Sequence, residues 1–215
     1  MILPSSKIFV FDLDDTLYSE LDFEKSGIEF VYNNFNIKHI ELKAILNNRE
    51  NWIEQIIDGS NNQITLQMVL DIYRNHFPTI QLYKDAKVFL EKLLSQGNEM
   101  SLITDGRSIT QRNKLRALGI ESYFKNIIIS EEINSEKPSE YNFRMVMNKK
   151  NADTYIYIAD NPNKDFITPN KLGWTSICLL DRGQNVHKQN FNISSEYLPL
   201  YLINSFEEII LYNEK

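Results

Sequence analysis

Residues 7–20 read "KIFVFDLDDTLYSE", an apolar run that leads directly into the aspartates Asp12, Asp14 and Asp15. Further short apolar runs rich in Ile, Val and Tyr occur at residues 99–104, 126–130, 154–159 and 174–180. Because these runs are apolar throughout rather than alternating, they are typical of strands that are buried on both faces of a parallel sheet. The sequence therefore predicts an α/β protein with a doubly wound, Rossmann-like parallel sheet as its core.

Amphipathic helical patterns separate the later runs. One covers residues 83–97, and another covers residues 108–120 with Ser108 as a candidate N-cap. Near the end of the chain, residues 200–212 predict a last strand followed by a helix that is capped by Ser205. Strands that alternate with helices in this way support the parallel sheet.

Residues 18–83 break this alternation. Apolar residues recur there at helical spacing, without a strand-like run between them, in the segments 21–35, 40–48, 50–58 and 64–77. We therefore expect an all-helical second domain at residues 18–83, inserted as a cap into a Rossmann-like core formed by residues 1–17 and 84–215. Trp52 and the aromatic residues of the insertion are expected to form its own small core.

Length and composition exclude several classes of protein. A chain of 215 residues is long enough for one core and a small inserted domain. The net charge of -6 argues against nucleic acid, because affinity for a duplex comes mainly from Lys and Arg. No apolar run approaches the roughly 18 residues of a membrane span, and the N-terminal stretch lacks the basic segment of a signal peptide. We expect a cytoplasmic protein without a membrane partner, with Cys178 as a buried, inert thiol.

Polar residues follow most of the predicted strands. In open parallel sheets the ligand crevice lies beyond the carboxyl ends of the strands. The residues expected there are Asp12 and Asp14 after the first run, Thr104, Asp105 and Gly106 after the second, Lys137 after the third, and Asp160 and Asp165 after the fourth. The order of the strands thus predicts that carboxylates, a hydroxyl and one lysine meet around a single cleft.

Four of these segments resemble, in order, the motifs of the haloacid dehalogenase superfamily of hydrolases. They are "DLDDT" (12–16), "LITDG" (102–106), the lysine of "EKP" (136–138) and "IADNPNKD" (158–165). The first motif is weak by itself, but the four together in this order are specific. The resemblance is to the phosphatase branch, in which a helical cap is inserted after the first motif. It implies hydrolysis of a small phosphorylated metabolite with Mg²⁺ as the cofactor.

The resemblance also implies a role for each residue in the reaction. Asp12 would attack phosphorus and form an aspartyl-phosphate, which splits a difficult displacement into two easier steps. Asp14 would act as the general acid for the leaving group and then as the base for water. Thr104 and the backbone amides of Asp105 and Gly106 would hold the phosphoryl oxygens.

The remaining motif residues would balance charge. Lys137 would neutralise the phosphoryl group. The Mg²⁺ ligands implied are the carboxylates of Asp12 and Asp160 and the backbone carbonyl of Asp14, with Asp165 as a further acidic contact to the metal shell or to Lys137. Oxygen ligands are those that Mg²⁺ prefers.

Residues near the first motif leave alternatives open. Tyr18, Ser19 and Glu20 face the predicted cleft, and Glu20 is a candidate for substrate binding. Asp15 is expected to satisfy a turn or a helix N-terminus rather than to touch substrate. The histidines His39, His76 and His187 lack a metal-ligand spacing, so surface or packing roles are expected for them.

Three competing functions are weighed against a phosphatase. A phosphomutase would use the same Asp12 and Asp14 but would return the phosphoryl group to a second position. A carbon–halogen hydrolase is disfavoured because halide needs no proton from Asp14 on leaving. A non-catalytic binding module is disfavoured because every catalytic position is intact.

Overall fold

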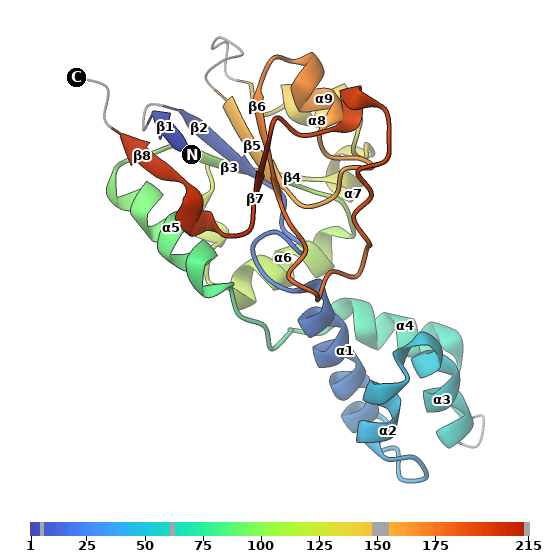
Figure 1. Cartoon of the computed structure of the whole chain (residues 1–215). Helices are drawn as coiled ribbons and strands as arrows, with labels where there is room; N and C mark the ends of the chain where they lie inside the picture. The colour runs from blue at the N-terminus through green and yellow to red at the C-terminus, as the bar shows by residue number, and fades with distance from the viewer. Residues whose placement is uncertain (5–6, 61–62, 148–154, 213–215) are drawn as a thin grey trace.

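The computed structural model describes residues 1–4, 7–60, 63–147 and 155–212. A six-stranded, fully parallel sheet has the order β4-β3-β2-β5-β6-β7 (Figure 1). Its strands are β2 (Ile8–Phe11), β3 (Met100–Thr104), β4 (Asn126–Ile129), β5 (Tyr155–Ala159), β6 (Thr175–Leu179) and β7 (Tyr201–Ile203). The predicted α/β fold with a doubly wound sheet is confirmed. Thr154, the first residue of the predicted fourth strand, lies outside the described residues.

The first long strand, β2, lies at the point where the strand order reverses. The chain passes from β2 outward to β3 and β4, then returns to β5 on the other side of β2 and continues to β6 and β7. In register, Val10 of β2 lies beside Ser101 of β3 and Tyr157 of β5. Such a reversal opens a crevice at the carboxyl ends of the strands. The aspartates that follow β2 are therefore placed in this crevice.

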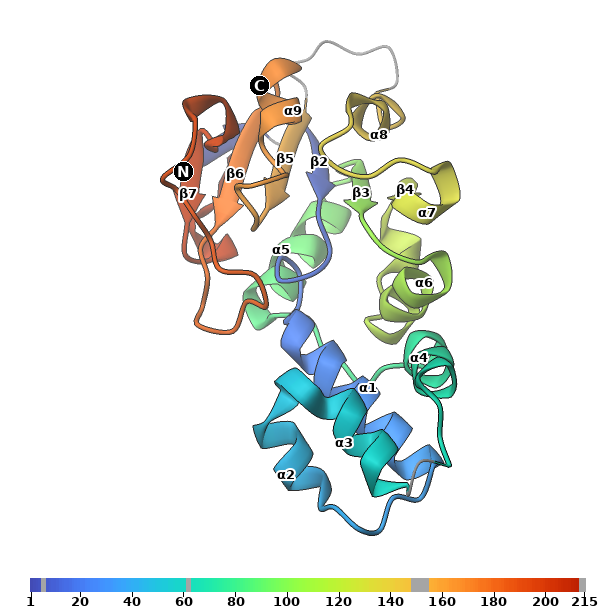
Figure 2. The same ribbon diagram turned by 90° about the vertical axis from the view of Figure 1, so that its right-hand side faces the viewer.

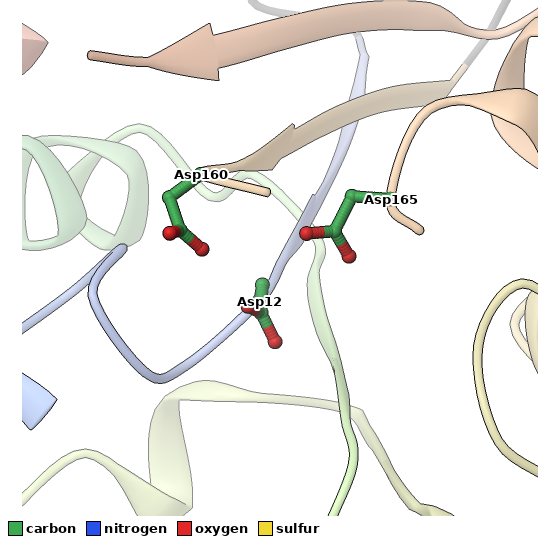
Figure 3. A group of neighbouring side chains, drawn as sticks. All are labelled: Asp12, Asp160 and Asp165. Atoms are coloured by element: carbon green, nitrogen blue, oxygen red, sulfur yellow. The ribbon is translucent and has the colours of Figure 1, made fainter. Parts of the chain in front are cut away.

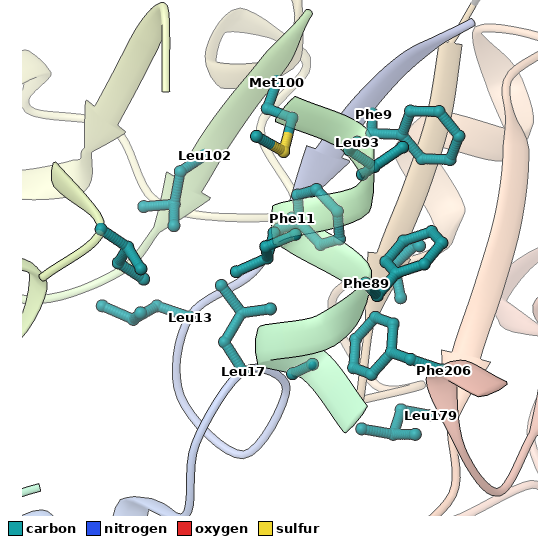
Figure 4. Packing of buried hydrophobic residues seen from close by; sticks show 14 of the residues in the cluster. Phe9, Phe11, Leu13, Leu17, Phe89, Leu93, Met100, Leu102, Leu179 and Phe206 are labelled. Atoms are coloured by element: carbon teal, nitrogen blue, oxygen red, sulfur yellow. The ribbon is translucent and has the colours of Figure 1, made fainter. Parts of the chain in front are cut away.

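Helices cover both faces of the sheet. On one face, Phe9 and Phe11 pack against α5 (Lys84–Ser95) and α6 (Ser108–Ala117), and the Phe11 and Phe89 rings lie edge to face at 6.4 Å (Figure 4). On the other face, Val10 joins a cluster that includes Phe143 of α8 (Glu140–Arg144). The other elements of this part are α7 (Ser130–Ile133), α9 (Ile167–Lys171), η2 (Glu121–Tyr123) and η4 (Ser195–Tyr197). Cover on both faces explains why the strands are apolar throughout.

The segment after β2 is a helical insertion with its own core. It contains α1 (Glu20–Asn34), α2 (Leu42–Asn47), η1 (Arg49–Asn51), α3 (Trp52–Gly59) and α4 (Leu66–Asn75). These helices form a group beside α6, away from the sheet (Figure 2). Their apolar cluster includes Trp52, as the sequence predicts. Within the described part of the chain, no helix is long and apolar enough to cross a membrane.

The C-terminal segment differs from the sequence prediction. The last strand of the main sheet, β7, forms as expected, and Ser205 accepts a hydrogen bond from the Glu207 N–H as a cap. However, the predicted helix is a single turn, η5 (Phe206–Glu208), and the chain continues into β8 (Ile210–Tyr212). This strand pairs in parallel with β1 (Ile2–Pro4) at the opposite end of the sequence. A three-residue strand is too short to show a periodic pattern, and its partner lies at the other end of the sequence.

A second difference concerns the start of α6. The N-cap is Arg107, and Ser108 is the first helical residue. The Ser108 N–H donates to Glu131 at 2.7 Å, and its hydroxyl donates to Glu132 at 2.6 Å. Carboxylates from α7 therefore satisfy the helix start in place of the predicted serine cap.

Candidate active site

Three buried carboxylates meet at the carboxyl edge of the sheet. Asp12 follows β2, Asp160 follows β5, and Asp165 lies in the loop before α9 (Figure 3). One carboxylate oxygen from each residue lies within 4.8 Å of those of the other two. The structure thus brings Asp12 together with two aspartates, Asp160 and Asp165, that lie far from it in the sequence. Like charges at this separation repel, so the cluster requires compensating positive charge.

Lys137 provides part of this compensation. Its side chain is fully buried, and its Nζ lies 2.7 Å from Asp12 Oδ1 and 2.8 Å from Asp165 Oδ1. Asp165 also accepts hydrogen bonds from the Tyr157 hydroxyl at 3.1 Å and from the Asn161 N–H at 3.1 Å. Protein groups thus donate to both oxygens of Asp165. Asp165 was expected to contact either the metal shell or Lys137, and the geometry favours the contact with Lys137.

The negative charge of the other two carboxylates, Asp12 and Asp160, is compensated only in part. Burial raises the pKa of Asp12 to about 6, although Lys137 opposes the shift. Burial also raises the pKa of Asp160, and the charges of Asp165 and Asp12 raise it further. A cation placed between these oxygens would relieve the cost of the buried negative charge. The cluster can therefore hold a metal ion through oxygen ligands.

Asp14 lies apart from this cluster and has its own partners. Lys114 Nζ lies 2.7 Å from Asp14 Oδ1, to which the Tyr18 hydroxyl also donates. The Gln111 side-chain amide donates to Asp14 Oδ2 at 2.9 Å. Burial acts to raise the pKa of Asp14, but the Lys114 charge and the three hydrogen bonds outweigh it and hold the pKa below its ordinary value. The structure thus separates the first two motif aspartates into different electrostatic environments.

Three predicted site residues lie at the end of β3 and in the loop after it, and they take different positions. Thr104 lines the cleft. Asp105 also lines it, accepts a hydrogen bond from the Lys137 N–H at 3.0 Å and lies 3.2 Å from Lys164 Nζ. Gly106 departs from the expectation, because its N–H donates to the Ser130 hydroxyl at 2.9 Å and it lies outside the residues that line the cleft.

The cleft at this edge encloses about 80 Å³. Its lining residues are Asp12, Asp14, Asp15, Glu20, Thr104, Asp105, Asp160, Asn161, Lys164 and His187. Glu20, the substrate-binding candidate, is among them, and burial together with the charge of Asp14 raises its pKa to about 8. Asp15 accepts hydrogen bonds from the Glu20 N–H and the Val186 N–H, both at 2.8 Å. Its expected role at a helix N-terminus is confirmed, although it also lines the cleft.

Several residues of this site were missed in the sequence. Lys164 directly precedes Asp165, but an isolated lysine in a polar turn reads as solvated. His187 is exposed, as expected, but it also lines the cleft, and the loop that carries it gave no signal of this position. Gln111 and Lys114 did leave a signal. They lie about one turn apart on the same face of α6 as Leu115, which is the face expected to be apolar. Polar residues at such positions are the signal.

Comparison with known proteins agrees with this geometry. Residues 9–179 match the family described as haloacid dehalogenase-like hydrolase, and the chain belongs to this family. It is 25% identical over 95% of its length to the glyceraldehyde 3-phosphate phosphatase of Methanocaldococcus jannaschii, of which it covers 95%. It is 30% identical to the phosphoserine phosphatase of Thermus thermophilus over 51% of this chain and 43% of that protein.

A solved structure extends the comparison. The hydrolase YfnB of Bacillus subtilis, determined bound to magnesium, superposes with a TM-score of 0.66 at 19% identity over 94% of this chain and 96% of that chain. At this identity the likeness concerns the fold. Together, the family membership and the phosphatase relatives confirm the predicted enzyme class, a phosphatase of the haloacid dehalogenase-like family.

Proposed function

We propose that this chain is a Mg²⁺-dependent phosphomonoesterase that hydrolyses a small phosphorylated metabolite through an aspartyl-phosphate on Asp12. One observation carries the proposal. Asp12 is paired with Lys137 inside the carboxylate cluster, whereas Asp14 is held outside it by Lys114. Two carboxylates in separate environments fit two different tasks, a nucleophile and a proton-transfer group.

The first step uses Asp12 and Lys137. A carboxylate oxygen of Asp12 forms a bond to phosphorus while the ester P–O bond breaks. At 4 Å, repulsion between this carboxylate and each phosphoryl charge costs roughly 1 kcal/mol in water and about 4 kcal/mol at an effective dielectric constant of 20. Lys137, at 2.7 Å from Asp12, offsets part of this cost and fixes one carboxylate oxygen.

The second step uses Asp14. Water attacks phosphorus, the bond from phosphorus to Asp12 breaks, and the Asp14 carboxylate takes the proton from the water. The ion pair with Lys114 lowers the pKa of Asp14 and thus favours the carboxylate that this step requires. In the first step the leaving oxygen needs a proton, which Asp14 must acquire when substrate binds. Glu20 is a second donor for that proton, because a pKa of about 8 keeps it protonated at neutral pH in the same cleft.

The carboxylate cluster fits Mg²⁺ because all of its side-chain ligands are oxygen atoms, and because its negative charge is larger than the positive charge that Lys137 supplies. Asp12 and Asp160 would supply carboxylate ligands, with the backbone carbonyl of Asp14. When bound, Mg²⁺ would offset the charge on the phosphoryl oxygens. Asp165, which is engaged by Lys137, Tyr157 and Asn161, would hold Lys137 in place.

The cleft supports a small substrate. Its volume of about 80 Å³ is far below the ~300–1,000 Å³ of drug-sized pockets. Thr104 and Lys164 would contact the phosphoryl group, and Glu20 and His187 would contact the rest of the molecule. The substrates named for the relatives, glyceraldehyde 3-phosphate and phosphoserine, are three-carbon phosphate esters. We propose esters of this size as the first substrates to examine.

We also propose residues 18–83 as a cap that closes over this cleft. The two linkers pair at its base, because Tyr18 forms a bridge with Leu82 and the Tyr83 N–H donates to the Leu17 carbonyl at 2.9 Å. This pairing supports boundaries at residues 17/18 and 83/84.

The decisive experiment measures phosphate release from a panel of three-carbon, sugar and nucleoside monophosphates, in Mg²⁺ and in excess chelator. We expect Mg²⁺-dependent release from at least one alkyl ester. The other functions give different products. An isomerised phosphate ester without free phosphate would indicate a mutase, and chloride from a 2-haloacid would indicate a dehalogenase. Binding of an ester without turnover would indicate a binding module.

A further inference from the structure

Helix α6 carries two pairs of polar side chains with different partners. Gln111 and Lys114 reach back to Asp14 in the first motif. Thr110 and Asn113 instead hold the end of α4 in the insertion. The Thr110 hydroxyl donates to the Arg74 carbonyl at 2.9 Å, and the Asn113 amide donates to the carbonyls of Asn75 and His76 at 3.2 and 3.1 Å. One short helix therefore contacts both a catalytic aspartate and the insertion.

The Asp14 carboxylate is held on both of its oxygens. Lys114 and Tyr18 engage Oδ1, and Gln111 engages Oδ2. The Gln111 amide also donates to Thr104 Oγ1 at 2.6 Å, so it links Asp14 to the end of β3. With donors on both oxygens, the carboxylate plane has little freedom to rotate. Such fixed orientation is what proton transfer to a leaving group requires.

The insertion completes the surroundings of Lys114. The Phe23 ring of α1 lies 4.3 Å from Lys114 Nζ, in the geometry of a cation–π contact. The Lys114 side chain is only 5% exposed, so it is enclosed between the two parts of the molecule. A displacement of α1 would remove the ring from the ammonium group.

We infer that Lys114 and Gln111 are positioning residues that orient the Asp14 carboxylate, and that the contact between Phe23 and Lys114 ties this orientation to the position of the insertion. Neither residue lines the cleft, so each acts through Asp14 rather than on the substrate. The inference rests on the proposed function, because it assigns the orientation of Asp14 to the reaction proposed above.

The test compares an alkyl phosphate with p-nitrophenyl phosphate, whose leaving group departs as a stable anion and needs little proton transfer. A positioned general acid accelerates departure of an alkoxide leaving group by about 10²–10⁴-fold. We therefore expect Lys114→Met and Gln111→Leu each to lower kcat for the alkyl ester by about 10-fold or more. The phosphorylation burst with the aryl ester and the KM for both esters should change little. Lys114→Arg should recover part of the alkyl activity, since it keeps the positive charge.

Two further variants keep the test independent of folding. Tyr18→Phe removes one hydroxyl and should shift the alkyl-to-aryl ratio in the same direction. Phe23→Leu keeps an apolar side chain and should shift the ratio by a smaller factor, because Lys114 stays paired with Asp14. The matched control is Lys125→Met, which removes an exposed ion pair of the same length, 2.7 Å to Glu99. It should leave the ratio unchanged.

Equal losses in the rate of phosphorylation with both esters, or a parental ratio of these rates in the folded Lys114, Gln111 and Tyr18 variants, would overturn the inference. Thermal unfolding of each variant identifies which ones are folded. Absence of phosphate release by the parent protein on every ester would instead refute the proposed function, so the two failures are distinguishable.

Discussion

At the carboxyl edge of the sheet, Asp12, Asp165 and Lys137 are both charged and buried, whereas the insertion buries apolar residues such as Ile28, Trp52 and Val69. Buried charges are tolerated only when each has a partner, so a single substitution leaves another charge uncompensated. Apolar packing in a small helical group accepts changes of shape at a lower cost. The buried charges are thus concentrated at the edge of the sheet, whereas the apolar packing of the insertion can vary at a lower cost.

The largest effect should come from Asp12→Asn at the edge of the sheet. The change is nearly isosteric but removes the proposed nucleophile, so we expect turnover to fall by about 10³-fold or more. Trapping of a phosphate mimic such as beryllium fluoride should be lost as well. Phosphate release and thermal unfolding should be measured together. Activity within about tenfold of the parent protein would exclude Asp12 as the nucleophile.

Asp160→Ala should have the next largest effect. Removal of one carboxylate from the cluster should raise the Mg²⁺ concentration needed for half-maximal activity by about 10-fold or more. Titration of activity with Mg²⁺ measures this shift. The matched control is Asp58→Ala, which removes an exposed carboxylate on α3 of the insertion, outside the residues that line the cleft. Full activity of the parent protein in excess chelator would contradict a metal site.

Changes on the insertion should be smaller and selective. Glu20 lines the cleft from the start of α1, so Glu20→Gln should change the order of preference among alkyl phosphates by about 5-fold, or roughly 1 kcal/mol. Activity on p-nitrophenyl phosphate should change less. The measurement is kcat/KM across the substrate panel. An equal change for all esters would mean that the insertion does not select among substrates. It would also weaken the distinction between the insertion and the charged edge of the sheet.

The smallest effect is the pH dependence of stabilisation by Mg²⁺. The pKa of Asp12 is raised to about 6 in the folded, metal-free protein, above the 3.8 expected for the unfolded chain. A raised pKa contributes stability that is fully present below the unfolded value and is lost as the pH rises through about 6. Mg²⁺ should restore this stability at higher pH, but below about pH 6 it must displace bound protons.

We therefore expect Mg²⁺ to raise Tm by about 2 °C or more near pH 7.5, and by less near pH 5. Thermal unfolding with and without Mg²⁺ at several pH values measures the difference. Asp160→Ala, with one ligand removed, should reduce the effect of Mg²⁺ at the higher pH. The same shift at both pH values would argue against protons competing with the metal at Asp12.

Much of the core was predictable because its signals are local. Apolar runs such as residues 7–11 mark buried strands, and the polar residues that end them fall at one edge once the sheet is parallel. The meeting of Asp12, Asp160 and Asp165 follows from that rule. The short pair β1 and β8 was missed, because it depends on two chain ends that are adjacent only in the folded protein.

The carboxylates of the site could be identified from the sequence alone, because strand order and motif order are both linear properties of the chain. The surroundings of Asp14 could not, because they depend on how distant segments pack. Gln111 and Lys114 lie 97 and 100 residues away from it, and although they share one face of α6 with Leu115, nothing within α6 identifies Asp14 as their partner. They are buried because α1 and α4 of the insertion pack against that face, with Phe23 over Lys114. Packing between distant segments, rather than any local pattern, sets the charge beside Asp14.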